Sequence, residues 1–129
     1  IGPRDLESGT VEVARRDTKE KETLQQTDIA NKIEHLLENI QLNLFRKAQN
    51  FREQMIHHVD SYDEFKKVLK EKGGFIMAHW DGATETEKKI KEETKATIRC
   101  IPSDNKKEAG KCIYTGKPSE QRVMFGIAY

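Results

Sequence analysis

The stretch Gly74–Pro102, GFIMAHWDGATETEKKIKEETKATIRCIP, predicts a strand, a helix and a second strand in immediate succession. Its first part, Phe75–Trp80, is a short apolar run that follows two glycines, as is typical of a buried strand. Thr84 and Glu87 have the spacing of a capping box, which predicts that the helix starts there. β-Branched residues then lead up to the proline, where the second strand is expected to end. The whole unit is expected to be a right-handed strand–helix–strand crossover.

A long amphipathic helix is predicted upstream of this unit. Apolar residues recur at three- and four-residue spacing from Ile29 to Val59, and no proline or glycine interrupts the run. A helix of about thirty residues would be about 45 Å long. A second capping box, Ser61–Glu64, predicts a shorter helix that ends with Gly73 in the C-cap role.

The start of the chain predicts two short strands. Ile1–Gly9 is expected to be a loop or strand exit followed by a turn, because it contains Gly-Pro and ends in Ser-Gly. Alternation of residue types predicts a strand at Thr10–Arg16, and a further short strand is expected at Glu22–Gln26.

The end of the chain predicts two more strands, Lys111–Thr115 and Arg122–Ala128, joined by a tight turn. Val123, Phe125 and Ile127 alternate and are expected to face the core. Together the elements predict an α/β (α+β) fold, in which a small mixed sheet packs with helices. The long helix and a residual strand precede that sheet.

The composition argues for one compact core and against a free-standing nucleic-acid binder. Of the 129 residues, 35% are charged and 35% are hydrophobic, which leaves little apolar material for a large core. The net charge is +1, from 23 basic and 22 acidic side chains, so any RNA contact must be local and no DNA partner is expected. No stretch has the length of a membrane span or the layout of a secretory signal, so a soluble cytosolic protein is expected.

The residues alone show no catalytic motif. The four histidines are scattered without the spacing of a helical metal site, and no nucleophile signature or phosphate-binding glycine loop is present. Cys100 and Cys112 are expected to be reduced thiols, with Cys100 a small buried core residue. The chain is therefore expected to carry no catalytic machinery and no cofactor of its own.

Several motifs resemble those of a known family. The sequences AHWDG at 78–82, EETKATIRCIP at 92–102, GKCxxTGKPS at 110–119 and FGIAY at 125–129 resemble the C-terminal domain of prolyl-tRNA synthetases of the archaeal and eukaryotic type. IGPRDL at 1–6 and VEVARRDT at 11–18 are similar to the closing part of the same family's anticodon-binding domain. The resemblance implies three segments: an anticodon-domain remnant at 1–27, a helical linker at 28–73 and a C-terminal α/β domain at 74–129.

The resemblance also implies a function for the intact protein. Such enzymes are class II synthetases that use ATP and magnesium to attach proline to its tRNA in two steps, as cytoplasmic homodimers. Their catalytic motifs would lie upstream of Ile1. This chain would then help to place proline-specific tRNA and would support its own catalytic domain.

The resemblance points to two sets of site residues. Arg4, Asp5, Arg15 and Arg16 are candidate tRNA contacts, because guanidinium groups can grip phosphates or guanine edges. Without the resemblance these side chains would be ordinary solvated charges. The C-terminal carboxylate of Tyr129 would extend toward the aminoacylation site.

The metal site of the family is degenerate in this sequence. Many relatives carry four cysteines that would bind structural zinc, and the matching positions here are Asp81, Thr86, Cys112 and Thr115. One thiolate, one carboxylate and two hydroxyls make a poor zinc site, so no zinc is expected. The small sheet is then expected to be held together by hydrophobic packing alone.

The alternative is a non-catalytic interaction module that docks to a partner through the long amphipathic helix. A reading frame that continues upstream of Ile1 into a class II catalytic domain would favour the synthetase. A start codon directly before Ile1 would favour the module.

Overall fold

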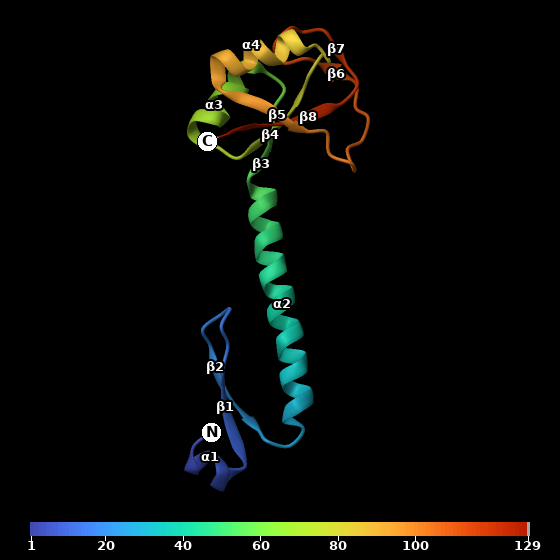
Figure 1. The fold of residues 1–129 in the computed structure, drawn as a ribbon. Coiled ribbons are helices and arrows are strands. Elements are labelled where there is room, and N and C mark those ends of the chain that lie inside the picture. The colour runs from blue at the N-terminus through green and yellow to red at the C-terminus, as the bar shows by residue number, and fades with distance from the viewer. Residues whose placement is uncertain (129) are drawn as a thin grey trace. The chain divides into compact units, whose positions relative to one another are not determined.

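The structure, a computed structural model, describes residues 1–128 and confirms the predicted mixture of helices with a small mixed sheet (Figure 1). The elements are α1 (Pro3–Ser8), β1 (Thr10–Ala14), β2 (Lys21–Gln25), α2 (Ile29–Gln54), β3 (Ile56–His58), α3 (Tyr62–Glu71), β4 (Phe75–His79), α4 (Thr84–Thr94), β5 (Ala96–Cys100), β6 (Gly110–Lys111), β7 (Pro118–Ser119) and β8 (Arg122–Ile127). Contacts divide the chain into two compact units, Ile1–Phe51 and Arg52–Tyr129. The division into segments 1–27, 28–73 and 74–129 stays a prediction.

The first unit begins with a helix where a loop was expected. Pro3 occupies the first turn of α1, and the Asp5 carboxylate accepts a hydrogen bond from the Gly2 backbone N–H at 2.7 Å. The prediction of a loop was therefore wrong. Proline at a helix start and an acidic residue in the first turn are both typical of helix starts. Both predicted strands are confirmed, and they pair as an antiparallel hairpin from Thr10↔Gln25 to Ala14↔Lys21.

The long helix α2 is confirmed, but it ends at Gln54 instead of Val59. Ile56–His58 leave the helical pattern and form β3, which pairs in parallel with β4. Strand pairing therefore overrides the helical periodicity of this segment. Within residues 1–128, no helix has both the length and the apolar character needed to cross a membrane.

The second unit is organised by a four-stranded sheet in the order β3-β4-β8-β5. β8 is antiparallel to β4 on one side and to β5 on the other. The predicted strand–helix–strand unit is thus present, with β8 lying between its two strands. A second, two-stranded ladder joins β6 to β7.

The two predicted capping boxes had different outcomes, although both helices start where they were expected. Ser61 caps α3 as expected, because its hydroxyl accepts the Glu64 backbone N–H at 3.2 Å. The capping box at the start of α4 was wrong, because Ala83 is the N-cap and Thr84 already lies in the helix. The Glu87 carboxylate instead accepts the backbone N–H of Ile98 in β5, at 3.2 Å.

The core of the second unit lies between the sheet and the helices α3 and α4. Its buried residues are Val59, Phe65, Val68, Ile76, Ala78, Ile90, Ala96, Ile113, Val123 and Phe125. Phe65 of α3 packs edge-on against Phe125 of β8, with ring centroids 5.2 Å apart. The core is therefore built from residues of both helices and of the central strands.

Three expectations for the C-terminal part were wrong. Ile127 is 48% exposed, because it borders an open cleft lined by side chains of α3 and α4. The strand expected at Lys111–Thr115 stops at Lys111, since residues 113–115 turn and the Gly116 N–H closes onto the Cys112 carbonyl at 2.9 Å. Cys100 is exposed instead of buried, and both cysteines are free thiols.

Candidate functional site

The predicted RNA-contacting residues of the first unit fall into two groups. Arg15 forms a bidentate ion pair with Asp17, in which Nε donates to Oδ1 at 3.0 Å and Nη2 donates to Oδ2 at 2.7 Å. Arg15 Nη2 also donates to Asn39 of α2 at 2.9 Å, and Asn43 donates to Asp17 at 2.7 Å. The Arg15 hydrogen bond holds the pKa of Asp17 well below its usual range. Arg15 therefore fixes the end of the β1–β2 hairpin to α2.

The other predicted tRNA-contacting residues, Arg4, Asp5 and Arg16, do not belong to this hydrogen-bonded group. Asp5 lies in the first turn of α1, and its carboxylate already has a partner in the backbone N–H of the N-cap residue Gly2. Arg4 and Arg16 are exposed. The cleft beside Arg15 is also lined by Glu20, Lys21 and Glu22, so its two cations are balanced by two carboxylates and it offers a phosphate no net positive charge. Contact of these arginines with tRNA stays a prediction, and Tyr129 lies outside the described residues.

In the second unit, three of the four degenerate metal positions come together. Asp81 Oδ2 accepts hydrogen bonds from Thr86 Oγ1 at 3.0 Å and from Thr115 Oγ1 at 2.8 Å. Asp81 Oδ1 accepts the backbone N–H of Ala83 at 3.2 Å. Partial burial raises the pKa of Asp81, but these hydrogen bonds outweigh it and leave the pKa below its usual value.

This donor set does not fit zinc. Both threonine hydroxyls already donate to the carboxylate, and hydroxyls are weak ligands for a metal that prefers thiolate and imidazole. Cys112, in the same turn as Thr115, is the one thiol among the four positions. No group of three or more His, Cys, Asp and Glu that could hold a metal occurs within residues 1–128. That the chain binds no zinc stays a prediction.

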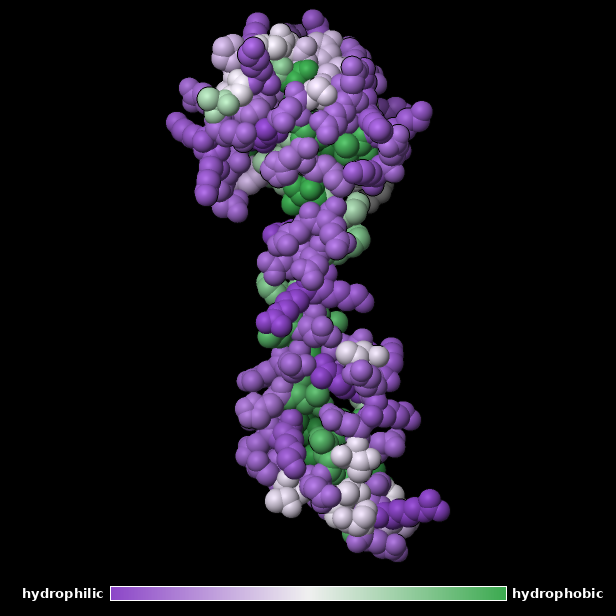
Figure 2. Space-filling view, turned by 180° about the vertical axis from the view of Figure 1, so that it is seen from behind, coloured by the Kyte–Doolittle hydropathy of each residue, from purple (hydrophilic) through white to green (hydrophobic). Residues whose placement is uncertain are grey.

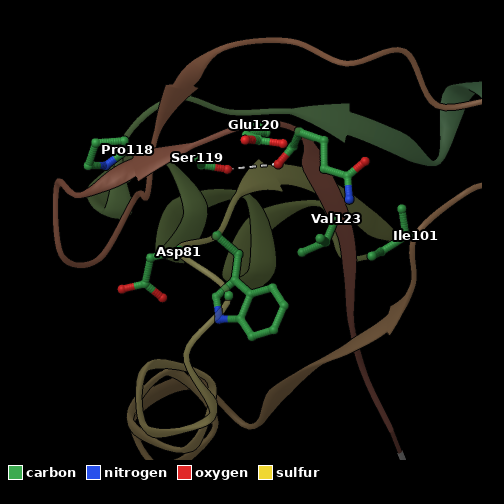
Figure 3. Close-up of a pocket in the computed structure, with 9 residues that line it drawn as sticks. Asp81, Ile101, Pro118, Ser119, Glu120 and Val123 are labelled. Atoms are coloured by element: carbon green, nitrogen blue, oxygen red, sulfur yellow. Dashed lines mark hydrogen bonds between the residues drawn. The ribbon is translucent and has the colours of Figure 1, made fainter.

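A buried histidine marks a second polar cluster, which the sequence did not reveal. His79 is 3% exposed, and its Nδ1 lies 3.1 Å from Ser119 Oγ. Its Nε2 lies 3.8 Å from the carboxylate of Glu108. Serine, histidine and glutamate are the residue types of a nucleophilic triad, but the Ser119 hydroxyl donates to the Gln121 carbonyl at 2.9 Å (Figure 3). A buried serine that donates elsewhere is a structural group.

A cleft of about 240 Å³ adjoins this cluster. Figure 3 shows Asp81 on one side of it, and Ile101 and Val123 on the other. The Trp80 ring also lines the cleft, and its Nε1 donates to the Ala83 carbonyl at 3.1 Å. Its lining is mostly apolar and presents no set of converging charged groups, so it indicates no particular ligand.

Arg122 connects the His79 cluster to the rest of the second unit. Its guanidinium donates to both oxygens of Glu108 at 3.0 and 3.1 Å, and to Asp60 at 2.5 Å. Its Nη1 donates to the Val59 carbonyl at 2.8 Å, and the residue is 9% exposed. The same hydrogen bonds lower the pKa of Glu108. The expectation that hydrophobic packing alone holds this sheet was therefore wrong.

Gly110→Ala is expected to destabilise the second unit by about 2 kcal/mol, because a Cβ there would overlap the buried His79 ring. The ring would have to move away from Ser119. The free energy of unfolding in urea, followed by Trp80 fluorescence, measures the effect. Ala109→Ser, at the exposed neighbouring position, is the matched control and should change little. Equal stabilities of the two variants would contradict the contact.

Comparison with known proteins gives the family. Residues 62–129 match the family model described as "Prolyl-tRNA synthetase, C-terminal", and residues 1–36 match the one described as "Anticodon binding domain". The chain is 60% identical over 129 residues to a proline–tRNA ligase of Christiangramia forsetii and to one of Cytophaga hutchinsonii, and 57% identical over 133 residues to one of Bacteroides fragilis. Each comparison covers 100% of this chain and 26–27% of the relative, so the chain spans about a quarter of the length of these relatives. On this evidence, the chain belongs to the prolyl-tRNA synthetase C-terminal family.

Proposed function

We propose that this chain is the C-terminal portion of a proline–tRNA ligase, a class II enzyme that uses ATP and magnesium to attach proline to its tRNA in two steps. The observation that carries the proposal is the 60% identity that extends over all 129 residues to proline–tRNA ligases. The catalytic core, with its ATP and magnesium, would belong to the part of the protein outside this chain.

Within that enzyme, the first unit would help to place proline-specific tRNA on its anticodon side. The match of residues 1–36 to an anticodon-binding domain supports this role. Arg4 and Arg16 would make the direct contacts, because their guanidinium groups are exposed. Arg15 and Asp5 would act indirectly, by holding the hairpin and the short helix in place.

Changing both Arg4→Ala and Arg16→Ala in the intact ligase is expected to raise KM for proline-specific tRNA about tenfold, because two phosphate or base contacts are lost. The tRNA-independent exchange of pyrophosphate into ATP should stay unchanged. Lys47→Ala, at an exposed cation on α2 beyond residue 36, is the control for loss of charge. An unchanged KM in the double variant would contradict the proposed contacts.

Arg15 requires a matched pair of variants. Arg15→Ala removes both the charge and the contact with Asp17, whereas Asp17→Asn weakens the same contact and keeps the guanidinium. If Arg15 only holds the hairpin, both variants should raise KM for tRNA to a similar extent. A much larger effect of Arg15→Ala would assign it a direct contact with tRNA.

The second unit would support the catalytic domain of the same protein, with the Tyr129 carboxylate extending toward the aminoacylation site. The assembly would be a homodimer in the cytoplasm, without membrane or DNA partners. We include the archaeal and eukaryotic type of enzyme in the proposal on the motifs between Phe75 and Tyr129, although the named relatives are bacterial. A degenerate, metal-free form of the C-terminal domain belongs to the same proposal.

The interaction module remains the second candidate because of the surface of α2. Leu37, Leu44 and Phe51 recur every seven residues and are 60%, 49% and 65% exposed. Figure 2 shows hydrophobic patches among hydrophilic side chains along this part of the chain. A reading frame that encodes no catalytic domain upstream of Ile1 would favour this candidate.

A further inference from the structure

The turn at residues 113–115 is anchored to its surroundings by carboxylates on two sides. On one side, the Thr115 hydroxyl donates to Asp81, which follows β4. On the other side, the Tyr114 hydroxyl donates to Glu93 near the end of α4, at 2.9 Å. Glu93 also accepts the hydroxyl of Tyr62 from α3 at 2.8 Å. The turn is thus tied to segments that are distant from it in the sequence.

Asp81 is the centre of the first of these anchors. Its carboxylate receives a hydroxyl from Thr86 in the first turn of α4, a hydroxyl from Thr115 in the turn, and the backbone N–H of Ala83. Thr86 is 5% exposed, so its hydroxyl depends on this partner. One carboxylate therefore joins the end of β4, the start of α4 and the turn.

We propose that the Asp81 cluster, formed by Asp81, Thr86 and Thr115, is a metal-free cross-link that holds the turn against α4. An ion held by thiolates at these three positions and at Cys112, in the same turn as Thr115, would join the same segments. Here the ionised carboxylate takes the central place, and the two hydroxyls and one backbone N–H are its donors. Hydrogen bonds to a charged acceptor are stronger than those between neutral groups, so one side chain suffices for three segments.

The cross-link predicts how the second unit responds to chelators and to loss of the carboxylate. The 129-residue chain, purified from zinc-supplemented medium, should contain no stoichiometric zinc, and excess EDTA should leave its Tm unchanged. Asp81→Asn should lower Tm by roughly 8 °C, because the amide is a weaker acceptor and its NH2 group opposes the donors around it. Trp80 is the single tryptophan, so its fluorescence reports on this unit.

Two further variants sharpen the measurement. Asp104→Asn removes an exposed carboxylate of the same unit and should leave Tm close to that of the parent chain. Thr115→Val removes one donor, and its effect should be largely lost when Asp81→Asn is already present. Additive effects of the two changes, or equal Tm values for Asp81→Asn and Asp104→Asn, would overturn the proposal. A chelator-dependent fall in the Tm of the unmodified chain would also overturn it.

A further variant tests whether the Asp81 carboxylate occupies the place that a metal ion would take. The triple variant Asp81→Cys, Thr86→Cys and Thr115→Cys, together with native Cys112, should bind one Co²⁺ with the absorption bands of a tetrahedral thiolate site. Its Tm should rise with Zn²⁺ and fall with EDTA, whereas the parent chain responds to neither. A triple variant that binds no metal would contradict the idea that the carboxylate occupies the place of an ion.

Discussion

Arg122→Met is expected to lower the free energy of unfolding of the second unit by about 3 kcal/mol, one of the two largest effects expected for a single substitution in this chain. Methionine fills similar space but donates nothing. The Val59 carbonyl, in a residue that is 1% exposed, would lose the 2.8 Å hydrogen bond from Nη1. Glu108 and Asp60 would lose their shared cation.

The buried end of the arginine should account for most of this loss. The side chains of Asp60 and Glu108 are 80% and 53% exposed, so water can hydrate both carboxylates once the guanidinium is gone. The Val59 carbonyl has no such replacement, and an unsatisfied buried acceptor costs about 1–3 kcal/mol. Arg122→Lys should be nearly as harmful, because a single ammonium cannot reach three partners in the planar geometry of the guanidinium.

Urea unfolding of the 129-residue chain, followed by the fluorescence of Trp80, measures the prediction. Asp60→Asn is the matched control, because it removes only the exposed end of the network and should cost less than about 1 kcal/mol. An Arg122→Met variant that loses no more unfolding free energy than Asp60→Asn would contradict the prediction. The buried hydrogen bond to Val59 would then contribute nothing to stability.

The sequence predicted correctly those elements whose conformation depends on neighbouring residues. The apolar run at Phe75–His79 forms β4, and four of its five residues are buried. The Ser61 hydroxyl caps α3 through a contact only three residues away. Each of these outcomes depends on a handful of neighbouring residues, which is the range over which sequence patterns are informative.

Several of the failures arose where distant contacts decide the conformation, whereas α1 was missed although its start signals, Pro3 and Asp5, are local. Ile56–His58 continue the helical spacing of α2, yet they pair with β4 about twenty residues further on. The network of Arg122 joins residues separated by 14, 62 and 63 positions, and no spacing rule connects them. The spacing of Asp81, Thr86 and Thr115 does not predict that they lie together. Only the resemblance to a family with metal ligands at these positions indicates it.

Gly74→Ala is expected to destabilise the second unit by about 3 kcal/mol, for two separable reasons. The backbone φ angle of +79° lies in the left-handed region, where alanine costs about 1 kcal/mol relative to glycine. A Cβ at this position would also overlap the carbonyl oxygen of Met55. That oxygen accepts the Phe75 N–H at 2.8 Å, so the overlap disturbs the start of the β3–β4 pairing.

Gly82→Ala separates the two reasons. Gly82 has nearly the same φ angle, +80°, but nothing lies within 4 Å of the position that its Cβ would take. Both variants should therefore carry the same backbone strain, and the difference in their free energies of unfolding, about 2 kcal/mol, should measure the overlap with Met55. Equal losses in the two variants would mean that β3 can shift away from Gly74 without leaving the sheet. A larger loss of unfolding free energy for Gly74→Ala would show that the chain needs a glycine here. Only a glycine lets the backbone come this close to Met55, the residue directly before β3.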